Sequence, residues 1–166
     1  MLTGNSAAMN PAALAHLSDA VHREIPSDPD EVRRVQEDIE RLLATRPMSE
    51  RDRFAIRLAV EEALVNAIKH GNQMDRAKKV RIAYQLRDHA FDIHITDEGP
   101  GFDPADVPDP TDPENLERPC GRGLMLMRHY MEVAHGPRGN CVHLRKVFLP
   151  NNGHAGNGHA GNGHAS

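Results

Sequence analysis

The spacing of apolar residues changes at Gly71, and this change constrains the fold more than any other feature. Upstream, apolar residues recur about every 3.6 residues, as on one face of a helix. Downstream, apolar and polar residues alternate over residues 80–86 and again over 91–96, with Asp88-His89 between the two runs. Such alternation predicts a β-hairpin with one buried face. Helices therefore precede an antiparallel hairpin.

Two amphipathic helices are predicted upstream of Gly71. The first covers residues 28–44, with Ser27 as its N-cap and a proline in its first turn. Ser49 opens the second helix, and Asp52 stands at the capping-box position. A rough alternation over residues 20–25 predicts an edge strand before both helices.

Residues 99–123 are dense in Gly, Pro and Asp, and a loop of this length inside a compact domain is usually functional. A helix at about 123–134, a turn at 136–139 and a strand at about 141–149 follow. The expected element order is βααββαβ. This order predicts a two-layer α/β sandwich, a mostly antiparallel sheet covered on one face by helices.

The 166 residues fit one domain, which we place at residues 19–150. Residues 1–18 are expected to form a flexible arm, and residues 151–166 a disordered low-complexity tail that repeats Asn-Gly-His-Ala. The tail histidines could chelate a transition metal weakly, but a flexible appendage is the favoured interpretation.

Composition narrows the class of protein. No apolar run approaches the ~20 residues that span a bilayer, and the first residues lack the pattern of a secretory signal. We therefore expect a cytoplasmic protein with no membrane contact. The net charge of −4, with acidic and basic residues interspersed, argues against a direct nucleic-acid partner. The two cysteines do not form a zinc pattern, so free thiols are expected.

The second helix carries a polar stripe. Projected at about 100° per residue, Glu62, Asn66, Lys69 and His70 share one sector of an otherwise apolar helix. The stripe is either a satisfied hydrogen-bond network or solvated edge, or a carboxylate base beside an amide oxygen that suits Mg²⁺. Glu61 projects about 100° away from Glu62, so Glu62 is the candidate base.

Two glycine-rich segments follow the hairpin and the long loop. Asp97-Glu98-Gly99-Pro100-Gly101 ends a strand, where the carboxylate can accept a hydrogen bond and the glycines permit a close approach. Gly121-Arg122-Gly123 is expected to open the third helix, where free N–H groups and the helix dipole favour phosphate.

In this order, the segments Glu62–Gly71, Asp97–Gly101 and Gly121–Met125 closely resemble the asparagine box and the two glycine boxes of the GHKL ATPase superfamily. The resemblance is closest to bacterial anti-sigma factor kinases, which phosphorylate a serine on an antagonist protein. It covers about residues 19–149.

The resemblance implies ATP and Mg²⁺ as cofactors. It implies that Asn66 binds Mg²⁺, that Glu62 is the base for the attacking serine hydroxyl, and that Asp97 binds the adenine amino group. It places other residues of the three boxes around the nucleotide: Lys69, His70, Gly99, Gly101, Gly121, Arg122, Gly123, Leu124 and Met125. The implied partners are a sigma factor, an antagonist of the STAS type and a second copy of the chain.

The loop over residues 102–120 departs from the family in its high proline content. Arg118 and Arg122 are the cations able to reach a γ-phosphate, and the sequence does not choose between them. For Cys120, in the same loop, an inert thiol is favoured over a redox switch.

Three other functions compete with a kinase that acts as an anti-sigma factor. One is the ATP-binding half of a histidine kinase, although no long phospho-acceptor helix precedes the domain. Another is a non-catalytic module that sequesters a partner. A gyrase-like ATPase would need a transducer domain. We expect the serine kinase.

Overall fold

The structure is a computed structural model that describes residues 19–101 and 119–149. The expected arm, most of the long loop and the tail lie outside these ranges. The elements in chain order are β1 (Val21–Pro26), α1 (Pro29–Leu43), α2 (Glu50–Asn66), a π-helical turn (Ala67–Gly71), β2 (Lys79–Leu86), β3 (Ala90–Thr96), α3 (Pro119–Tyr130), β4 (Glu132–His135) and β5 (Cys141–Val147).

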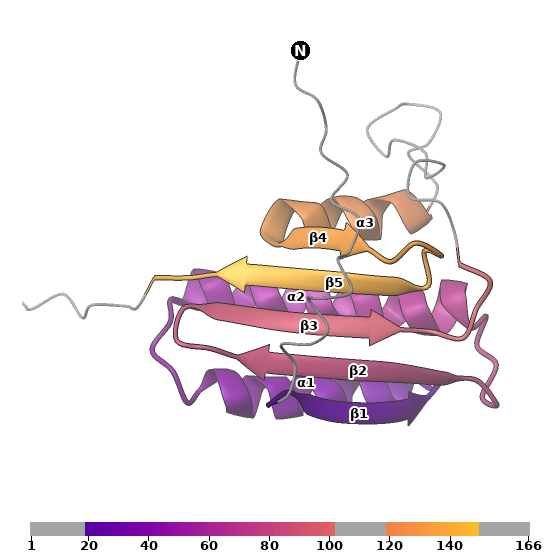
Figure 1. Ribbon diagram of the computed structural model, residues 1–166, viewed down its shortest axis with the longest axis horizontal. Coiled ribbons are helices and arrows are strands. Elements are labelled where there is room, and N and C mark those ends of the chain that lie inside the picture. The colour runs from indigo at the N-terminus through magenta and orange to yellow at the C-terminus, as the bar shows by residue number, and fades with distance from the viewer. Residues whose placement is uncertain (1–18, 102–118, 150–166) are drawn as a thin grey trace, which may run out of the picture.

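The strands form one antiparallel sheet in the order β1-β2-β3-β5-β4. Figure 1 shows α1 and α2 behind the sheet, with α3 beside the β4 edge. Cross-strand pairing aligns Ile82 with Ile95 and Ile93 with Leu144, and these four side chains are buried. The predicted two-layer α/β sandwich, with helices on one face of an antiparallel sheet, is therefore confirmed.

The third helix and the strand after it differ from the prediction. The helix begins at Pro119 and ends at Tyr130, instead of spanning about 123–134. Residues 132–135 then form β4, an edge strand that was not predicted. Four residues are too short a run to show alternation, and pairing with β5 gives them their strand conformation.

The start of α1 also differs. Its N-cap is Asp28, whose side chain accepts a hydrogen bond from the N–H of Asp30, and not Ser27 as predicted. Ser27 is buried, and its hydroxyl donates to the carbonyl of Lys78. The predicted cap of α2 is confirmed, because Ser49 Oγ accepts from the N–H of Asp52 at 3.1 Å.

Both faces of the central strand β3 are buried. Phe91, Ile93 and Ile95 face the helices, as the alternation predicts. Asp92 and His94 on the opposite face are also buried, which the prediction of one buried face missed. The reason lies in β5, where the His143 ring stacks on His94 at 4.1 Å and its Nε2 lies 2.9 Å from Asp92 Oδ1.

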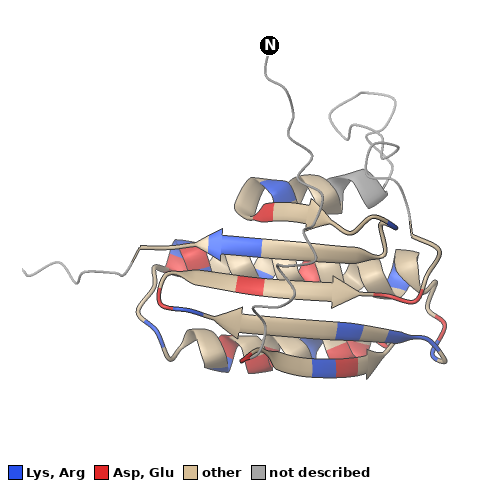
Figure 2. Ribbon diagram, in the orientation of Figure 1, with Lys and Arg blue, Asp and Glu red and all other residues tan. Residues whose placement is uncertain are grey.

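Charged residues of both signs are distributed over the described elements. Figure 2 shows acidic and basic residues on the strands and on the helices behind them. Among the described residues, no helix is long and apolar enough to cross a membrane.

Candidate functional site

The polar side chains of α2 meet the first turns of α3 at Gly123. A methyl group added to Gly123 would lie 2.8 Å from Glu62 Oε2 and 3.1 Å from Asn66 Nδ2. Only a hydrogen atom fits at this position without displacing one of the two side chains. The structure thus brings together the first and third of the segments that the sequence singled out.

The second segment meets the end of the same helix. A Cβ at Gly71 would lie 2.3 Å from the carboxyl carbon of Asp97, and one at Gly99 would lie 2.0 Å from the carbonyl oxygen of Gly71. These glycines let the backbone after α2 pack directly against the end of β3. They serve a contact within the protein, whereas the sequence left open whether another backbone or a flat ring comes close.

Asp97 is a buried carboxylate at this junction. Its Oδ1 accepts a hydrogen bond from the Gly99 N–H at 2.8 Å. Burial raises the pKa of Asp97, while the Gly99 N–H and the charge of Lys78 act in the opposite direction. A carboxyl group that is kept buried, although burial disfavours its charged form, is typical of a binding or catalytic group.

The backbone of Asp97 is held from the β4–β5 turn. Its N–H donates to the carbonyl of Asn140 at 2.9 Å, and Asn140 Nδ2 donates to its carbonyl at 3.1 Å. Gly101 also packs here. Its φ is +77°, and a Cβ would lie 1.6 Å from the carbonyl oxygen of Arg138, so only glycine fits.

The π-helical turn changes the direction of Lys69. Its closing bond runs from the N–H of Asn72 to the carbonyl of Ala67, five residues back. A π turn holds more residues than an α turn, so the following side chains lag behind an α-helical projection. The expectation that Lys69 shares the sector of Glu62 and Asn66 is therefore wrong.

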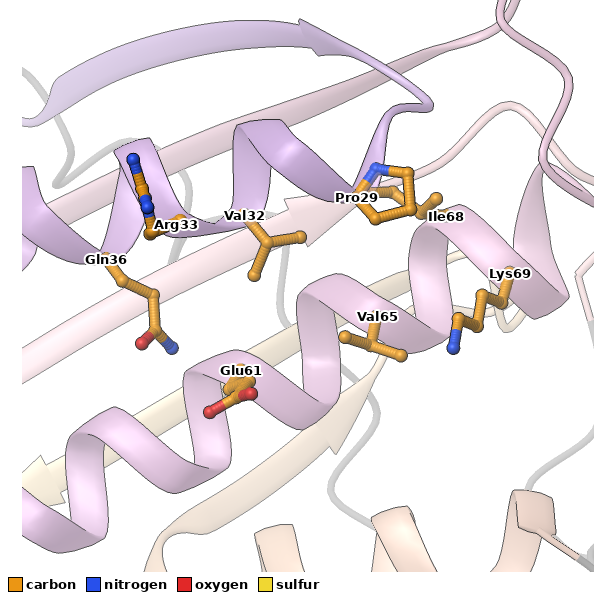
Figure 3. A pocket seen from close by; sticks show the side chains of 8 residues that line it. All are labelled: Pro29, Val32, Arg33, Gln36, Glu61, Val65, Ile68 and Lys69. Atoms are coloured by element: carbon orange, nitrogen blue, oxygen red, sulfur yellow. The ribbon is translucent and has the colours of Figure 1, made fainter.

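Lys69 instead lines a cavity of about 260 Å³ between α1 and α2. Figure 3 shows Glu61, Val65 and Lys69 in turn along this side of the helix, with Arg33 and Gln36 across from Glu61 and Pro29 across from Lys69. Glu61 thus faces α1 while Glu62 faces α3, the separation that the helical projection predicts. The cavity lies apart from the contact between Glu62, Asn66 and Gly123.

The remaining candidates differ in what their side chains can reach. Leu124 is part of the hydrophobic core, so any contact that it makes with a ligand would come from its backbone. Met125 and His70 are exposed. Gly121 lies in the first turn of α3. Arg118 and the side chains of Cys120 and Arg122 lie outside the described residues.

Two asparagines at this site were missed by the sequence reasoning. Asn140 binds the backbone of Asp97, and Asn72 is fully buried and binds the N–H of Glu98. The only signal for Asn72 is its place directly after His70-Gly71, and Asn140 has only its place in a glycine-rich turn.

A family model described as the histidine kinase-like ATPase domain matches residues 25–146. The chain belongs to this family. The match takes in all three segments and strands β2, β3 and β4, with all but the last residue of β5. Membership implies that this ATPase domain binds ATP.

Curated relatives in the family carry two kinds of name. The chain is 31% identical over 87 residues to "Serine/threonine-protein kinase BtrW" of Bordetella bronchiseptica, which covers 51% of this chain and 61% of that protein. It is 35% identical over 98 residues to "Anti-sigma F factor" of Bacillus licheniformis, which covers 55% and 66%. The match thus spans less than two thirds of either relative.

A solved structure shares the fold. The crystal structure of the RsbU and RsbW domains of Rv1364c from Mycobacterium tuberculosis aligns with a TM-score of 0.54 at 19% identity. The alignment covers 79% of this chain and 33% of that one. At this identity the likeness supports the architecture of the ATPase domain and not its activity.

The residues of the described site fit a nucleotide and one metal ion that comes with it. Glu62 and Asn66 face a position that holds no side chain, and Asp97 offers a buried acceptor next to backbone without side chains. Residues 19–101 and 119–149 contain no group of three or more His, Cys, Asp or Glu side chains that could hold a metal by themselves. A hard cation here would depend on phosphate oxygens and an amide oxygen, which is usual for Mg²⁺.

Proposed function

We propose that this chain is an ATP-dependent protein-serine kinase that acts as an anti-sigma factor. It phosphorylates a serine on an antagonist protein of the STAS type and sequesters a sigma factor, so that the two partners compete for it. The observation that carries the proposal is the placement of Glu62 beside Asn66, opposite Gly123. The names of the relatives, a serine/threonine-protein kinase and an anti-sigma F factor, support it.

Each residue of the site has one task in this proposal. Asp97 accepts a hydrogen bond from the adenine amino group, and Asn66 holds Mg²⁺ through its amide oxygen. Bound Mg²⁺-ATP supplies the phosphoryl group and the neutralising charge. Glu62 accepts the proton that the serine hydroxyl loses as its oxygen bonds to the γ-phosphorus and the bond to the ADP oxygen breaks. Positioning supplies most of the catalysis in such a transfer.

The partner proteins follow from the same proposal. We propose that the chain works in the cytoplasm as a homodimer and binds no nucleic acid directly. The alternative, an ATP-binding domain of a histidine kinase, would instead serve phosphorylation of a histidine, whose phosphate is labile in acid. The acid stability of the product therefore separates these two classes.

The test is incubation of the full chain with γ-labelled ATP, Mg²⁺ and each STAS-type protein encoded in the same genome. We expect acid-stable label on a serine of one of them. The variant Glu62→Gln should bind ATP as the wild type does and transfer no label. Glu61→Gln is the matched control, because this substitution removes the same charge one residue away, on the side of the helix that faces α1. It should transfer normally.

Two results would overturn the proposal in different ways. Normal transfer by Glu62→Gln would remove Glu62 as the base. ATP binding without label on any STAS-type protein would instead favour a non-catalytic module that sequesters its partner.

A further inference from the structure

Asn72 has the most completely buried polar side chain at the site, with 0% exposure. It follows the π-helical turn directly, and its own N–H closes that turn on the carbonyl of Ala67 at 2.8 Å. Its backbone is therefore fixed to the helix that carries Asn66. A buried amide in such a place must have hydrogen-bond partners, and those partners define its function.

The amide group of Asn72 joins three segments that are distant in the sequence. Its Oδ1 accepts from the N–H of Glu98 at 2.8 Å. Its Nδ2 donates to Ser27 Oγ at 2.9 Å and to the carbonyl of Lys79 at 3.0 Å. The Glu98 N–H can only donate and the Lys79 carbonyl can only accept, so these partners fix which way the amide faces.

The bond to Glu98 controls the position of Asp97. Asp97 is the preceding residue, and its own backbone is held from the other side by Asn140. Residues 97 and 98 are thus held by two asparagines, one from the β4–β5 turn and one directly after the π-helical turn. The Asn72 bond connects the backbone beside Asp97 to the helix of Asn66, where Gly71 also packs against Asp97. It sets the distance between the proposed adenine-binding group and the proposed metal-binding group.

Neighbouring contacts reinforce this clamp. The carbonyl oxygen of Gly71 packs against Gly99, where no Cβ fits. Glu98 Oε2 also accepts from the N–H of Lys79 at 2.6 Å, so the residue after Asp97 is tied to the start of β2 as well. Residues 97–99 cannot shift together without breaking the Asn72–Glu98 bond.

We propose that Asn72 is a positioning residue that selects adenine nucleotides by holding Asp97 at a fixed distance from Asn66. This rests on the proposed function, in which Asp97 binds the adenine amino group. Guanine carries a carbonyl oxygen where adenine carries that amino group, so a fixed carboxylate rejects guanine. A carboxylate free to move discriminates less, since selectivity requires the wrong ligand to leave a polar group unpaired.

The test measures binding of ATP and GTP to the full chain in the presence of Mg²⁺, together with thermal unfolding. For Asn72→Ala we expect the dissociation constant for GTP divided by that for ATP to fall by roughly tenfold, which corresponds to the loss of one hydrogen bond. Ser27→Ala is the matched control. It removes one partner of Asn72 from the same buried network but leaves the bond to Glu98. It should lower the midpoint of unfolding and leave the ratio unchanged.

A second variant keeps the test decisive if Asn72→Ala fails to fold. Asn72→Asp retains an oxygen for the Glu98 N–H and loses both donations by Nδ2. This variant should be less stable than the wild type and have the same ratio of dissociation constants for GTP and ATP. Hydrogen exchange at the Glu98 amide gives an independent reading, which should be slow in the wild type and in Asn72→Asp, and fast in Asn72→Ala.

Contrary results fall into two kinds. The role of Asn72 would be overturned by a folded Asn72→Ala protein with the wild-type ratio. It would also be overturned if Ser27→Ala or Asn72→Asp lost the preference for ATP. Neither result would bear on the proposed kinase function. A wild-type chain that does not prefer ATP to GTP would overturn the role of Asp97 in adenine recognition, and the inference with it.

Discussion

Glu62 and Gly123 face each other across the contact between α2 and α3, and a methyl group on Gly123 would lie 2.8 Å from Glu62 Oε2. The two residues are far apart in the sequence, in segments that the sequence connects only by their order. Their contact makes the absence of a side chain at position 123 a requirement of the site. This requirement for glycine can be tested by nucleotide binding alone, without measuring phosphoryl transfer.

Gly123→Ala should weaken ATP binding without unfolding the protein. The added methyl group would displace the end of the Glu62 or Asn66 side chain. Alanine within a helix is more stabilising than glycine by about 0.5–1 kcal/mol, so the fold itself should not suffer. We expect the dissociation constant for ATP, measured by calorimetric titration, to rise by roughly tenfold or more. Arg128→Ala, at an exposed position of the same helix, is the control. Wild-type affinity in Gly123→Ala would place the nucleotide elsewhere.

Asp97→Asn should separate stability from binding. Burial raises the pKa of Asp97 above its value in the unfolded chain, so the folded protein holds this proton more tightly. The charged carboxylate therefore lowers the free energy of unfolding once the pH exceeds the unfolded value. Asparagine keeps an oxygen for the Gly99 N–H and removes the charge. At pH 7 we expect equal or greater stability in urea and a loss of ATP binding. Asp88→Asn, in the exposed hairpin turn, should change neither; a less stable Asp97→Asn would contradict this account.

The stacked histidines should make the protein sensitive to acid. Burial and the neighbouring charge of His143 lower the pKa of His94 to about 4, although Asp92 acts in the opposite direction. Between pH 6.5 and that value the unfolded chain binds the proton and the folded chain does not, so stability falls as the pH falls.

Asp92 contributes in the same direction. Burial would raise its pKa, but the hydrogen bond from His143 and the charge of Arg145 outweigh burial and lower it. From His94 we expect about 1–3 kcal/mol of unfolding free energy to be lost between pH 7 and about 4.5. Asp92 adds to this loss as the pH falls further, toward and below its unfolded value of 3.8. His94→Gln should flatten this slope, and His89→Gln, in the hairpin turn, should not. Equal slopes in urea titrations of all three proteins would contradict the assignment.

Lys69→Gln should bind ATP as the wild type does. The π-helical turn directs Lys69 to the α1 side of α2, away from Asn66. Asn66→Ala, by contrast, should abolish binding of Mg²⁺-ATP. Calorimetric titration of both variants checks the pair. A large loss of affinity in Lys69→Gln would mean that the lysine turns toward the nucleotide after all.

Local patterns were sufficient for most of the fold. The alternation over the hairpin, the Ser49 cap and the separation of Glu61 from Glu62 all depend on residues a few positions apart, where the period of one element decides which face is buried. The periodicity could not reveal β4, because four residues become a strand only by pairing with β5.

The other wrong predictions arise where tertiary structure overrides a local pattern. Ser27 is a good N-cap by its position, but it bonds to Asn72 and Lys78, which lie 45 and 51 residues away. Asp92 and His94 look like the solvent side of an alternating strand until His143 covers them. The π-helical turn leaves no mark in the spacing of residues, since one extra residue in a turn changes only the direction of those that follow.

The sequence by itself determined most of the elements, their core-facing sides and the three segments that are proposed to bind the nucleotide. These follow from periodicity, capping and glycine placement, which act over a few residues. Only the tertiary structure decided that Gly123 meets Glu62, that Lys69 turns away, and that Asn72 clamps the loop of Asp97. Those relationships depend on hydrogen bonds and close approaches between distant segments, which form because a buried polar group must find a partner wherever the fold brings one.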